Sequence, residues 1–391
     1  MKIGFLCLDD PTKIRTYSGI PYHLTRYLTR AGNEVVILGP YPVRRLRVRI
    51  ENTVLRTFTG KELIHERHPA MVQQYAKIIS NYHDQNPDLD VFLATSAFQL
   101  GTARANVPLV FWGDTTFAGV VHKYDRYFNL SERTISYCHA AEQHALNSCD
   151  LAIFSSQWAA NVAQESYRVD PGKIRVITYG ANLLRSPTEQ EVREFIALRS
   201  DQRVKVLLIG ANWWRKGVDK AIATVAELRR RGLDASLKVI GCYPPNGQAI
   251  PEFVSLGGKI VKDTQEGQDQ MADMMGSSHL LILPTVAECA AVVLAEASAF
   301  GLPVLTTDVG GNASLVRPGM NGSLLDLNAT AEQWADAAES IVGNGRTSYE
   351  DAAWRAFRLF HGELSWERAV TRFEAEMRGL LSPRMCDAIS A

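Results

Sequence analysis

The stretch from Leu280 to Gly322, LLILPTVAECAAVVLAEASAFGLPVLTTDVGGNASLVRPGMNG, decides the fold of this 391-residue chain. It begins with an apolar strand, passes through Pro284 into a turn and a helix, and reaches a second apolar strand at Val304. Open α/β sheets are built from such units, and they bind phosphorylated ligands where a strand ends and a helix begins. The stretch therefore predicts a parallel sheet with a ligand-binding edge.

Two carboxylates bracket the start of this predicted helix. Glu288 precedes the helix and Glu296 lies in its early turns, with seven residues between them. Because a carboxylate repels a phosphate, we expect both to accept hydrogen bonds from hydroxyl groups on either side of a diphosphate, which describes a sugar nucleotide. The alternative for Glu296 is a first-turn carboxylate that only complements the helix dipole.

One β-α-β pattern occurs twice along the chain. The first copy has strand 3–8, helix 20–30 and strand 35–38, and the second has strand 204–209, helix 218–231 and strand 237–240. Alternation of strands and helices requires parallel sheets with right-handed crossovers. We therefore expect two Rossmann-like α/β domains that face each other across a cleft. Further strands are predicted at residues 91–94, 109–112, 151–154, 174–177, 259–261, 280–283 and 304–307.

The length of the chain also favours two domains, because it exceeds the size at which one hydrophobic core stops growing. The most polar stretch, residues 182–202, contains a predicted helix at 189–198, so we place a hinge near Asn182, between domains 1–182 and 183–364. Residues 349–381 are expected to be helical. Gly180 before the junction is expected to form a left-handed turn.

Composition excludes several classes of protein. Lysine plus arginine equals aspartate plus glutamate, at 42 each, so no overall field recruits nucleic acid or an anionic membrane. The six cysteines show no Cys-x-x-Cys spacing and are expected to be reduced core residues. The first strand meets Asp9 and Asp10 too early for a signal peptide, and no apolar run is long enough to span a bilayer. These features predict a cytoplasmic enzyme.

The spacing of Glu288 and Glu296, together with Phe300–Val304 and Asp308–Gly311, resembles the Glu-x7-Glu motif of retaining GT-B glycosyltransferases, particularly glycosyltransferase family 4. The resemblance implies a GT-B fold in which a last helix, about residues 365–391, crosses back onto the first domain. It also implies that the first domain takes the acceptor and the second the donor, a nucleotide-diphosphate sugar (UDP- or GDP-sugar). The expected reaction is retaining transfer of a hexosyl group to an acceptor hydroxyl.

The same resemblance assigns the two carboxylates: Glu296 would bind the ribose and Glu288 the donor hexose. Donor contacts are expected from Gly210 and from the loop that follows Glu288, namely Ala290, Ala291 and Val292. Here the chain departs from the family's pattern, because Ala291 stands where a glycine is usual.

The loop after the second domain's first strand supplies cations. Lys216 precedes Gly217, where the chain turns into a helix, and a cation there can neutralise the charge that develops on a departing diphosphate. Relatives usually carry an arginine just after the strand glycine, but this chain has Ala211 and Asn212. Either Arg215 supplies that second charge, or the site has one cation and backbone donors. The alternative is that Arg215 and Lys216 are solvated loop charges.

Three residues of the first domain are candidates for the site, Gly19 and Ser18 as donor contacts and Asp114 as a catalytic residue. Gly19 occupies the position of a family glycine that approaches the donor, and the Ser18 hydroxyl before it can also cap the first helix. Asp114 follows a predicted strand and is expected to contact the acceptor or a donor hydroxyl. Gly113 stands where relatives have a histidine. An ordinary turn aspartate is the alternative for Asp114.

Two charged motifs carry other interpretations. Asp88-Leu89-Asp90 matches a metal-binding motif, but it precedes a strand instead of following one, so we interpret it as a strand boundary and predict no metal or cofactor. Residues 44–50 alternate arginine with apolar residues, which favours a half-exposed strand. The alternative is a basic patch that contacts lipid headgroups or an anionic acceptor, with the protein peripheral at the inner face of the membrane.

The predicted function is therefore a metal-independent, retaining hexosyltransferase that acts on an acceptor not identified by the sequence: a glycan, a lipid-linked molecule or a small molecule. Two rivals remain. A catalytically silent or regulatory sugar-nucleotide-binding protein is suggested by the departures at Gly113, Ala211 and Ala291. An epimerase would need an acid/base pair over the sugar ring, which the sequence does not identify.

Overall fold

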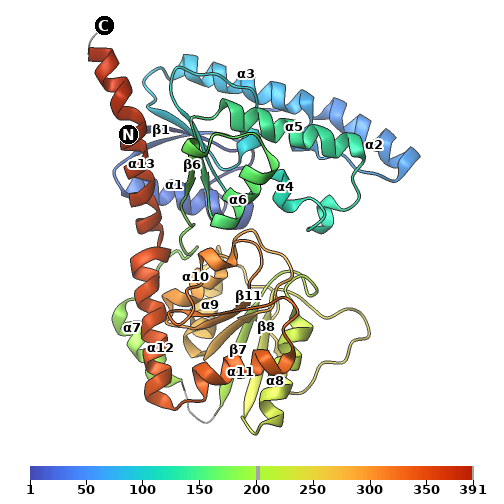
Figure 1. Ribbon diagram of the computed structural model, residues 1–391, viewed down its shortest axis with the longest axis vertical. Helices are drawn as coiled ribbons and strands as arrows, with labels where there is room; N and C mark the ends of the chain where they lie inside the picture. Colours follow the sequence, from blue (N-terminus) through green and yellow to red (C-terminus); the bar gives the residue numbers. More distant parts are fainter. Residues whose placement is uncertain (200–202, 390–391) are drawn as a thin grey trace. The chain divides into compact units, whose positions relative to one another are not determined.

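The computed structural model describes residues 1–199 and 203–389, and the chain divides into two compact units (Figure 1). Unit 1 contains Met1–Thr178 and the chain from Ala369 onward, and unit 2 contains Tyr179–Arg368. The division falls close to Asn182, where the sequence places its hinge. Each unit holds one sheet.

Unit 1 contains a six-stranded sheet in the order β2-β1-β3-β4-β5-β6, in which every neighbouring pair is parallel. Strands β1, β3, β4 and β5 are almost entirely buried, which explains their nearly continuous apolar sequences. The strands are β1 Lys2–Leu6, β2 Glu34–Leu38, β3 Val91–Ala94, β4 Leu109–Gly113, β5 Leu151–Phe154 and β6 Ile174–Val176.

Helices connect these strands, and α3 and α5 pack against each other beside the sheet (Figure 1). Helix α1 begins after Gly19 with Pro21 in its first turn and ends at Arg30, as the sequence predicts. The helices of this part are α1 Ile20–Arg30, α2 Leu46–Thr59, α3 Pro69–Gln85, α4 Phe117–Val120, α5 Glu132–Ser148 and α6 Gln157–Ser166.

The prediction of a strand at residues 44–50 is wrong, because Leu46 begins helix α2. The alternation that suggested a strand covers only a few residues. Beyond Ile50 the apolar side chains recur every four residues, at Val54 and Phe58, which is a helical spacing. Val48 is the fully buried residue of this helix.

Unit 2 contains a second parallel six-stranded sheet, in the order β12-β11-β10-β7-β8-β9. The repeat predicted around residues 204–240 is confirmed. The strands are β7 Val204–Ile209, β8 Ala235–Ile240, β9 Val254–Leu256, β10 Leu280–Leu283, β11 Val304–Thr307 and β12 Gly322–Leu325. The helices are α7 Glu189–Leu198, α8 Val218–Arg230, α9 Gln265–Ser277, α10 Val293–Ala299, α11 Ala331–Val342 and α12 Arg346–Leu359.

The strand predicted at residues 259–261 is wrong, and the edge strand of this sheet is β9, Val254–Leu256. Only Val254 of β9 is buried, so its sequence carries little apolar signal. Strand β12 was not predicted either, since a glycine and a serine open its four residues. Both strands lie at the edges of the sheet, where less burial is required.

The C-terminal helical segment is interrupted. Helix α12 continues into a π-helical turn, Phe360–Leu364, and extended Ser365 separates it from α13, Trp366–Ile389. The prediction that residues 349–381 are helical is therefore confirmed everywhere except at Ser365, and the last helix begins at Trp366. From Ala369 onward α13 belongs to unit 1, where the Phe373 ring stacks on Trp112 at 5.7 Å between centroids.

Gly180 is explained by packing and not by a left-handed turn. A Cβ atom at this position would lie 2.2 Å from the backbone nitrogen of Trp366, and its φ is not positive. The Trp366 indole also donates to Asn182 Oδ1 at 2.9 Å. The end of the α12–α13 connection therefore requires the smallest residue here.

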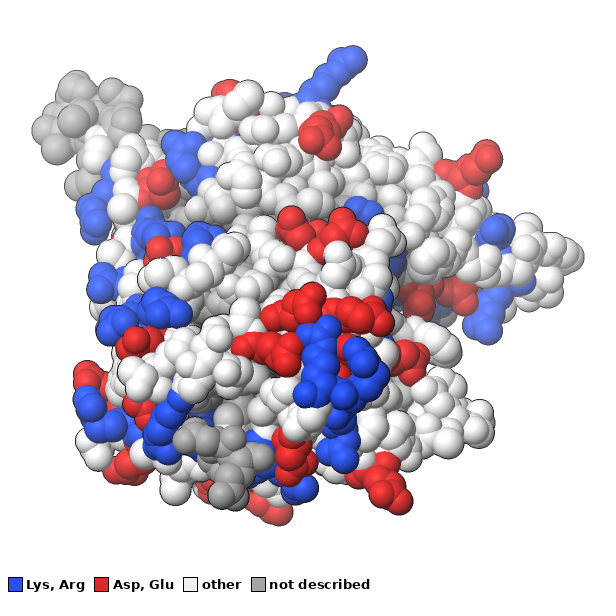
Figure 2. Space-filling model, turned by 60° about the horizontal axis from the view of Figure 1, so that its bottom comes forward, with Lys and Arg blue, Asp and Glu red and all other residues white. Residues whose placement is uncertain are grey.

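Charged residues are intermixed over the surface. Figure 2 shows lysine and arginine side chains lying beside aspartate and glutamate side chains on the face in view. One such group joins Arg231 at the end of α8 to Glu227, Asp336 and Glu339. Among the described residues no helix has the length and apolar character needed to cross a bilayer.

Candidate functional site

Each sheet has a point at which its strand order reverses, and this is where open α/β sheets bind ligands. In unit 2 the reversal lies between β7 and β10, and in unit 1 it lies between β1 and β3. The loops that leave the carboxyl ends of these strands carry most of the residues that the sequence singles out.

The β7–α8 loop is fixed by two glycines. Gly217 has a left-handed φ of 69°, and a Cβ atom there would lie 1.9 Å from the Pro284 carbonyl oxygen at the end of β10. Gly210 lies directly against the Lys216 side chain, where a Cβ atom would meet Cγ at 2.4 Å. The Thr285 hydroxyl and the Val286 amide both donate to the Arg215 carbonyl. The loop is therefore joined to the chain after β10.

Both cations of this loop converge on Glu288. Arg215 Nη1 and Lys216 Nζ contact the same carboxylate oxygen, Glu288 Oε1, and Arg215 also donates to the Ala287 carbonyl at 2.9 Å. Lys216 and Glu288 are buried, and Arg215 is partly exposed. They are not solvated loop charges, so that alternative is wrong. The cluster has two positive charges around one negative charge.

The electrostatic state of Lys216 follows from its position. Burial disfavours the charged ammonium and lowers the pKa of Lys216, and the neighbouring Arg215 acts in the same direction. The Glu288 carboxylate opposes this shift. A second anion near Lys216 would likewise favour the protonated form.

Glu296 lies in the first turn of α10 and is almost completely buried. Lys262, from the loop between β9 and α9, donates to both of its carboxylate oxygens, at 3.1 and 2.9 Å. The sequence alone does not identify Lys262, because no motif joins it to a residue 34 positions away. Glu296 is therefore held by a lysine and does more than complement the helix dipole.

The segment between the two carboxylates turns tightly. Ala291 is buried in the hydrophobic core of unit 2, and Ala290 and Val292 are partly exposed. Gly310, with φ 56°, passes so close that a Cβ atom would lie 1.6 Å from the Glu288 carbonyl oxygen, and Gly311 N donates to that oxygen at 3.3 Å. The Gly-Gly pair thus positions the backbone of Glu288.

The two tryptophans of the β7–α8 loop have different environments. Trp213 is buried and its indole donates to Asp219 Oδ1 at 3.0 Å, so it is a packing residue. Trp214 is largely exposed. Gln248 also donates to Asp219, at 2.6 Å, which links the loop after β8 to the start of α8.

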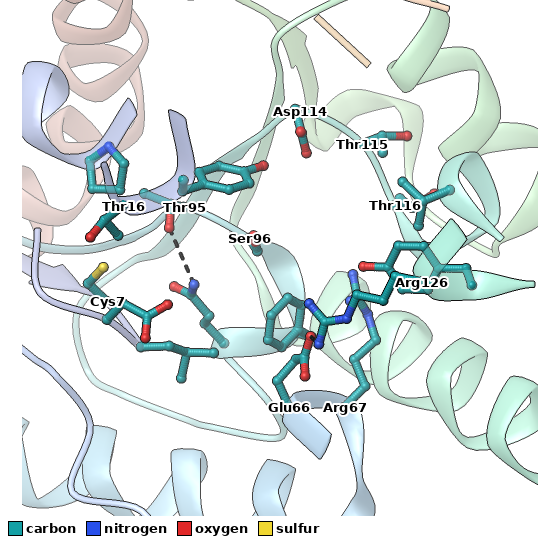
Figure 3. Close-up of a pocket in the computed structure, with 18 of the residues that line it drawn as sticks. Cys7, Thr16, Glu66, Arg67, Thr95, Ser96, Asp114, Thr115, Thr116 and Arg126 are labelled. Atoms are coloured by element: carbon teal, nitrogen blue, oxygen red, sulfur yellow. Dashed lines mark hydrogen bonds and ion pairs between the residues drawn. The ribbon is translucent and has the colours of Figure 1, made fainter. Parts of the chain in front are cut away.

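Unit 1 contains a cavity of about 330 Å³ at the carboxyl ends of β1, β3 and β4. Figure 3 shows Asp114 at one side of this cavity and Arg67 and Arg126 at the other. Hydroxyl and amide side chains, together with the charged Asp9, Arg45 and Glu66, complete its polar lining, and Gln99 Nε2 donates to Thr95 Oγ1 at 3.3 Å. The hydroxyl and amide residues of the lining are Thr16, Tyr17, Thr95, Ser96, Gln99, Thr115, Thr116 and Tyr127.

Asp114 follows β4 directly and is half-buried. Desolvation raises the pKa of its carboxyl group, while a hydrogen bond with the Tyr17 side chain and one with the Thr115 backbone act in the opposite direction. At Gly113 a Cβ atom would make only ordinary contacts, at 3.5 Å, with Phe111 and the Thr95 carbonyl. Space alone therefore does not explain the glycine at this position.

The β1–α1 loop is strained beside this cavity. Tyr17, Ser18 and Gly19 all have positive φ, at 45°, 56° and 88°. For tyrosine and serine this conformation is unfavourable and is typical of functional segments. Gly19 and not Ser18 is the residue that precedes α1, so the predicted capping role of Ser18 is wrong. Tyr17 lines the cavity.

A buried ion pair supports the other side of the cavity. Arg67 Nε donates to Glu142 Oε2 at 3.3 Å, and the guanidinium lies over the Phe98 ring at 4.2 Å. Glu142 also accepts from the Phe117 amide at 3.3 Å. The two partners are 75 residues apart in sequence, so no local pattern identifies Arg67. The pair holds one cation at the cavity wall.

Other motifs serve structure. Lys2 Nζ contacts Asp88 at 2.6 Å and the Lys2 amide donates to Asp90 at 2.7 Å, so this motif is the predicted boundary of β3. Five cysteines are buried and free, as predicted, whereas the Cys386 side chain lies outside the described residues.

Two family profiles match the chain. "Glycosyltransferase Family 4" matches residues 21–185, and "Glycosyl transferases group 1" matches residues 203–344. Together they cover most of the chain, and each falls largely within one unit.

Curated relatives are similar over part of their length. D-inositol 3-phosphate glycosyltransferase of Rhodococcus opacus (strain B4) is 31% identical over 55% of this chain and 51% of that protein. The protein of the same name from Corynebacterium glutamicum (strain R) is 28% identical over 64% of this chain and 60% of that protein. The chain thus spans about half the length of the first of these relatives.

Solved structures share the fold at low identity. Sucrose-phosphate synthase from Thermosynechococcus elongatus matches with a TM-score of 0.66 and 17% identity over 98% of this chain and 99% of that chain. Anabaena HepE in complex with UDP-glucose matches with a TM-score of 0.60 and 15% identity over 99% and 100%. The two parallel sheets are those of the GT-B fold, and the chain belongs to the group 1 glycosyltransferases of the family 4 type.

Proposed function

We propose that this protein transfers a hexosyl group from a nucleotide-diphosphate sugar to an acceptor hydroxyl, with retention at the anomeric carbon and without a metal ion. The observation that carries the proposal is the convergence of Arg215 and Lys216 on Glu288 at the strand-order reversal of unit 2. A diphosphate is the ligand whose departure such a cluster assists.

The charge of the cluster favours binding of a diphosphate. Two cations around one carboxylate form a group with net positive charge, and such a group attracts an anion and stabilises the charge that develops as it leaves. The leaving phosphate oxygen would take the proton of the attacking hydroxyl. A strong enzymic base at the reacting carbon is then unnecessary, and protein cations take the role of a metal.

Glu296 supplies the second element of the proposed donor site. Its carboxylate is buried and satisfied by a lysine, so a ligand that replaces Lys262 must itself donate hydrogen bonds. The two ribose hydroxyls of a nucleotide can do so. Glu288 then contacts the hexose, and Gly210, Ala290 and Val292 lie in the loops that would approach the diphosphate.

The names of similar proteins agree with this donor. HepE was solved with UDP-glucose, and the curated relatives are named glycosyltransferases, so we propose a UDP- or GDP-sugar here. The acceptor would enter the cavity of unit 1. Its hydroxyl-rich lining and the half-buried Asp114 suit a polyhydroxylated molecule, such as a glycan, the polar end of a lipid-linked sugar or a small polyol.

The test is incubation of the full chain with labelled UDP- and GDP-hexoses, with and without candidate acceptors and in the presence and absence of a chelator. We expect slow donor hydrolysis without acceptor, transfer with acceptor, and no effect of the chelator. The anomeric configuration of the product, read by NMR, tests retention.

Each other outcome has a clear meaning. Binding of the donor in a thermal-shift assay without turnover would favour the silent or regulatory protein. Conversion of the donor to its epimer would favour the epimerase. If transfer is lost only when the chelator is present, the proposed metal independence is wrong, but the proposed glycosyl transfer still holds.

A further inference from the structure

Helix α2 carries an apolar stripe on its exposed side. Leu46, Ile50, Val54 and Phe58 recur every four residues and are 72, 57, 51 and 82% exposed. Residues four apart lie on one side of a helix, so these side chains form one continuous strip over about 20 Å. Among the described residues no other helix carries more than one exposed large apolar side chain, and single exposed apolar residues are ordinary on a protein surface.

The opposite side of α2 fixes its orientation. Val48 is buried in the core of unit 1, Leu55 packs against the same core, and Asn52 Oδ1 accepts from the Leu63 amide at 2.8 Å. The helix therefore cannot turn its stripe inward without losing these contacts. Figure 1 shows α2 at the edge of unit 1.

Positive charge flanks the stripe. Arg44, Arg47, Arg49 and Arg56 are exposed, and Lys61 follows the helix. The one acidic residue of α2, Glu51, is partly buried and is engaged by His68 at 3.2 Å and Arg133 at 3.4 Å. The exposed side of α2 is therefore apolar and cationic.

A second exposed aromatic residue lies near the end of α2. Gly60 ends the helix in a left-handed conformation, and its carbonyl accepts from Asn129 Nδ2 at 2.6 Å. Asn129 follows Phe128, which is 55% exposed. Two large aromatic side chains, Phe58 and Phe128, are thus presented near the same end of the helix.

We propose that the exposed face of α2 lies on an anionic lipid bilayer, with the stripe in the headgroup region and the arginines at the lipid phosphates. An amphipathic helix that combines apolar and arginine side chains binds such an interface in this way. Charge complementarity selects an anionic membrane, because each arginine close to it contributes attraction. The inference rests on α2 itself and is independent of the proposed reaction.

The position of α2 suggests what the contact achieves. Arg45 is the residue that precedes α2, and it also lines the unit 1 cavity with Glu66 and Arg126. The cavity rim therefore continues into the helix that would rest on the bilayer. An acceptor held in the membrane by a lipid would have its polar end presented beside that rim.

The test is sedimentation of the full chain with vesicles made of equal parts phosphatidylglycerol and phosphatidylcholine, compared with vesicles of pure phosphatidylcholine. We expect binding to the anionic vesicles only, lost near 1 M salt, where the screening length falls to about 3 Å. Ile50→Asp with Val54→Asp should weaken binding at least about tenfold, since both side chains leave the interface.

Matched variants separate the apolar and electrostatic contributions. Arg47→Gln with Arg49→Gln should weaken binding by roughly fivefold per residue. Leu198→Asp and Arg358→Gln change equally exposed residues of unit 2 and should leave binding unchanged. Unaltered thermal unfolding shows that each variant is folded.

The proposal is overturned if the unaltered chain ignores anionic vesicles, or if the α2 variants bind them normally. Light scattering tests one further outcome. If the unaltered chain is a dimer, the Ile50→Asp, Val54→Asp variant is a monomer and neither binds vesicles, the stripe packs against a second copy of the chain and the membrane proposal is wrong.

Discussion

The strand-order reversals of the two units have the same topology, but their carboxylates have different partners. In unit 2 both carboxylates are neutralised by cations, Glu288 by Arg215 and Lys216 and Glu296 by Lys262. In unit 1 the half-buried Asp114 interacts with the Tyr17 side chain instead, and desolvation raises the pKa of its carboxyl group. The two arginines opposite it are paired with other carboxylates, Arg67 with Glu142 and Arg126 with Glu66.

This difference teaches which ligand each scaffold suits. A cluster with net positive charge suits a diphosphate, whereas a cavity lined mainly by hydroxyl groups, with carboxylates among its arginines, suits a molecule with many hydroxyl groups. Under the proposed function, unit 2 provides the donor site and unit 1 the acceptor site, and a few charged side chains make the difference. Single substitutions in either unit test this contrast.

Lys216→Gln should have the largest effect, because it removes the buried cation that contacts Glu288. Loss of one preorganised donor to a developing charge costs about 10²–10³ in rate, so kcat/KM for the donor should fall by that factor. Steady-state transfer and donor hydrolysis measure it. Lys205→Gln, on the exposed surface of β7, is the control, and equal activity of the two variants would remove Lys216 from the donor site.

Glu296→Ala should weaken nucleotide binding by roughly 10- to 100-fold, since hydrogen bonds to a charged group contribute about 1.5–3 kcal/mol. Calorimetric titration with UDP and GDP measures the loss. The rate constant for the bound donor should change less, because the ribose lies away from the reacting carbon. Glu266→Ala on exposed α9 serves as control, and full affinity in Glu296→Ala would refute the ribose assignment.

Asp114→Asn should reduce the rate of transfer about tenfold, which is the effect expected when one hydrogen bond to a carboxylate is lost. Donor hydrolysis should be unchanged. Because its pKa is raised, the carboxylate is lost as pH falls, beginning at a higher pH than for an ordinary aspartate. Transfer in the unaltered protein should therefore decline on the acid side earlier than donor hydrolysis does. The variant should lack this separate decline, and Asp84→Asn should retain it.

Lys262→Met should have the smallest effect and the opposite sign. The lysine must release Glu296 before ribose can bind, so the variant destabilises the unliganded protein more than its complex with nucleotide. The pair is partly solvent-screened, which limits the gain to about two- to fivefold tighter nucleotide binding. Lys259→Met is the neighbouring control. Weaker binding in Lys262→Met would indicate that the lysine contacts the nucleotide itself.

The interior strands were predictable because burial on both faces leaves a continuous apolar run. Residues 91–94, 151–154, 280–283 and 304–307 were placed at their observed bounds for this reason. Edge strands β9 and β12 lack that signal, and the prediction failed there. At residues 44–50 a short alternation predicts a strand, but the apolar spacing through Phe58 is helical and the segment from Leu46 forms helix α2.

The candidate site was predictable where function lies within one local motif. Glu288, Glu296 and Lys216 are adjacent to strand ends and glycines, and the structure places Lys216 and Glu288 in contact. Lys262 and Arg67 were not predictable, because their partners lie 34 and 75 residues away and no local pattern marks them. Ion pairs of this kind form only when separate loops meet.

The amino-acid sequence alone predicts the two parallel sheets and the order of the motifs along the chain, because apolar periodicity and glycine placement act over a few residues. The resemblance of the segment from Glu288 to Gly311 to the Glu-x7-Glu motif indicates the family. The tertiary structure alone decided which charge neutralises which. It joined Lys262 to Glu296, set Arg67 against Glu142, and turned the apolar stripe of α2 outward. The physical reason is that electrostatic pairing and exposure depend on distances in space, which a linear sequence does not contain.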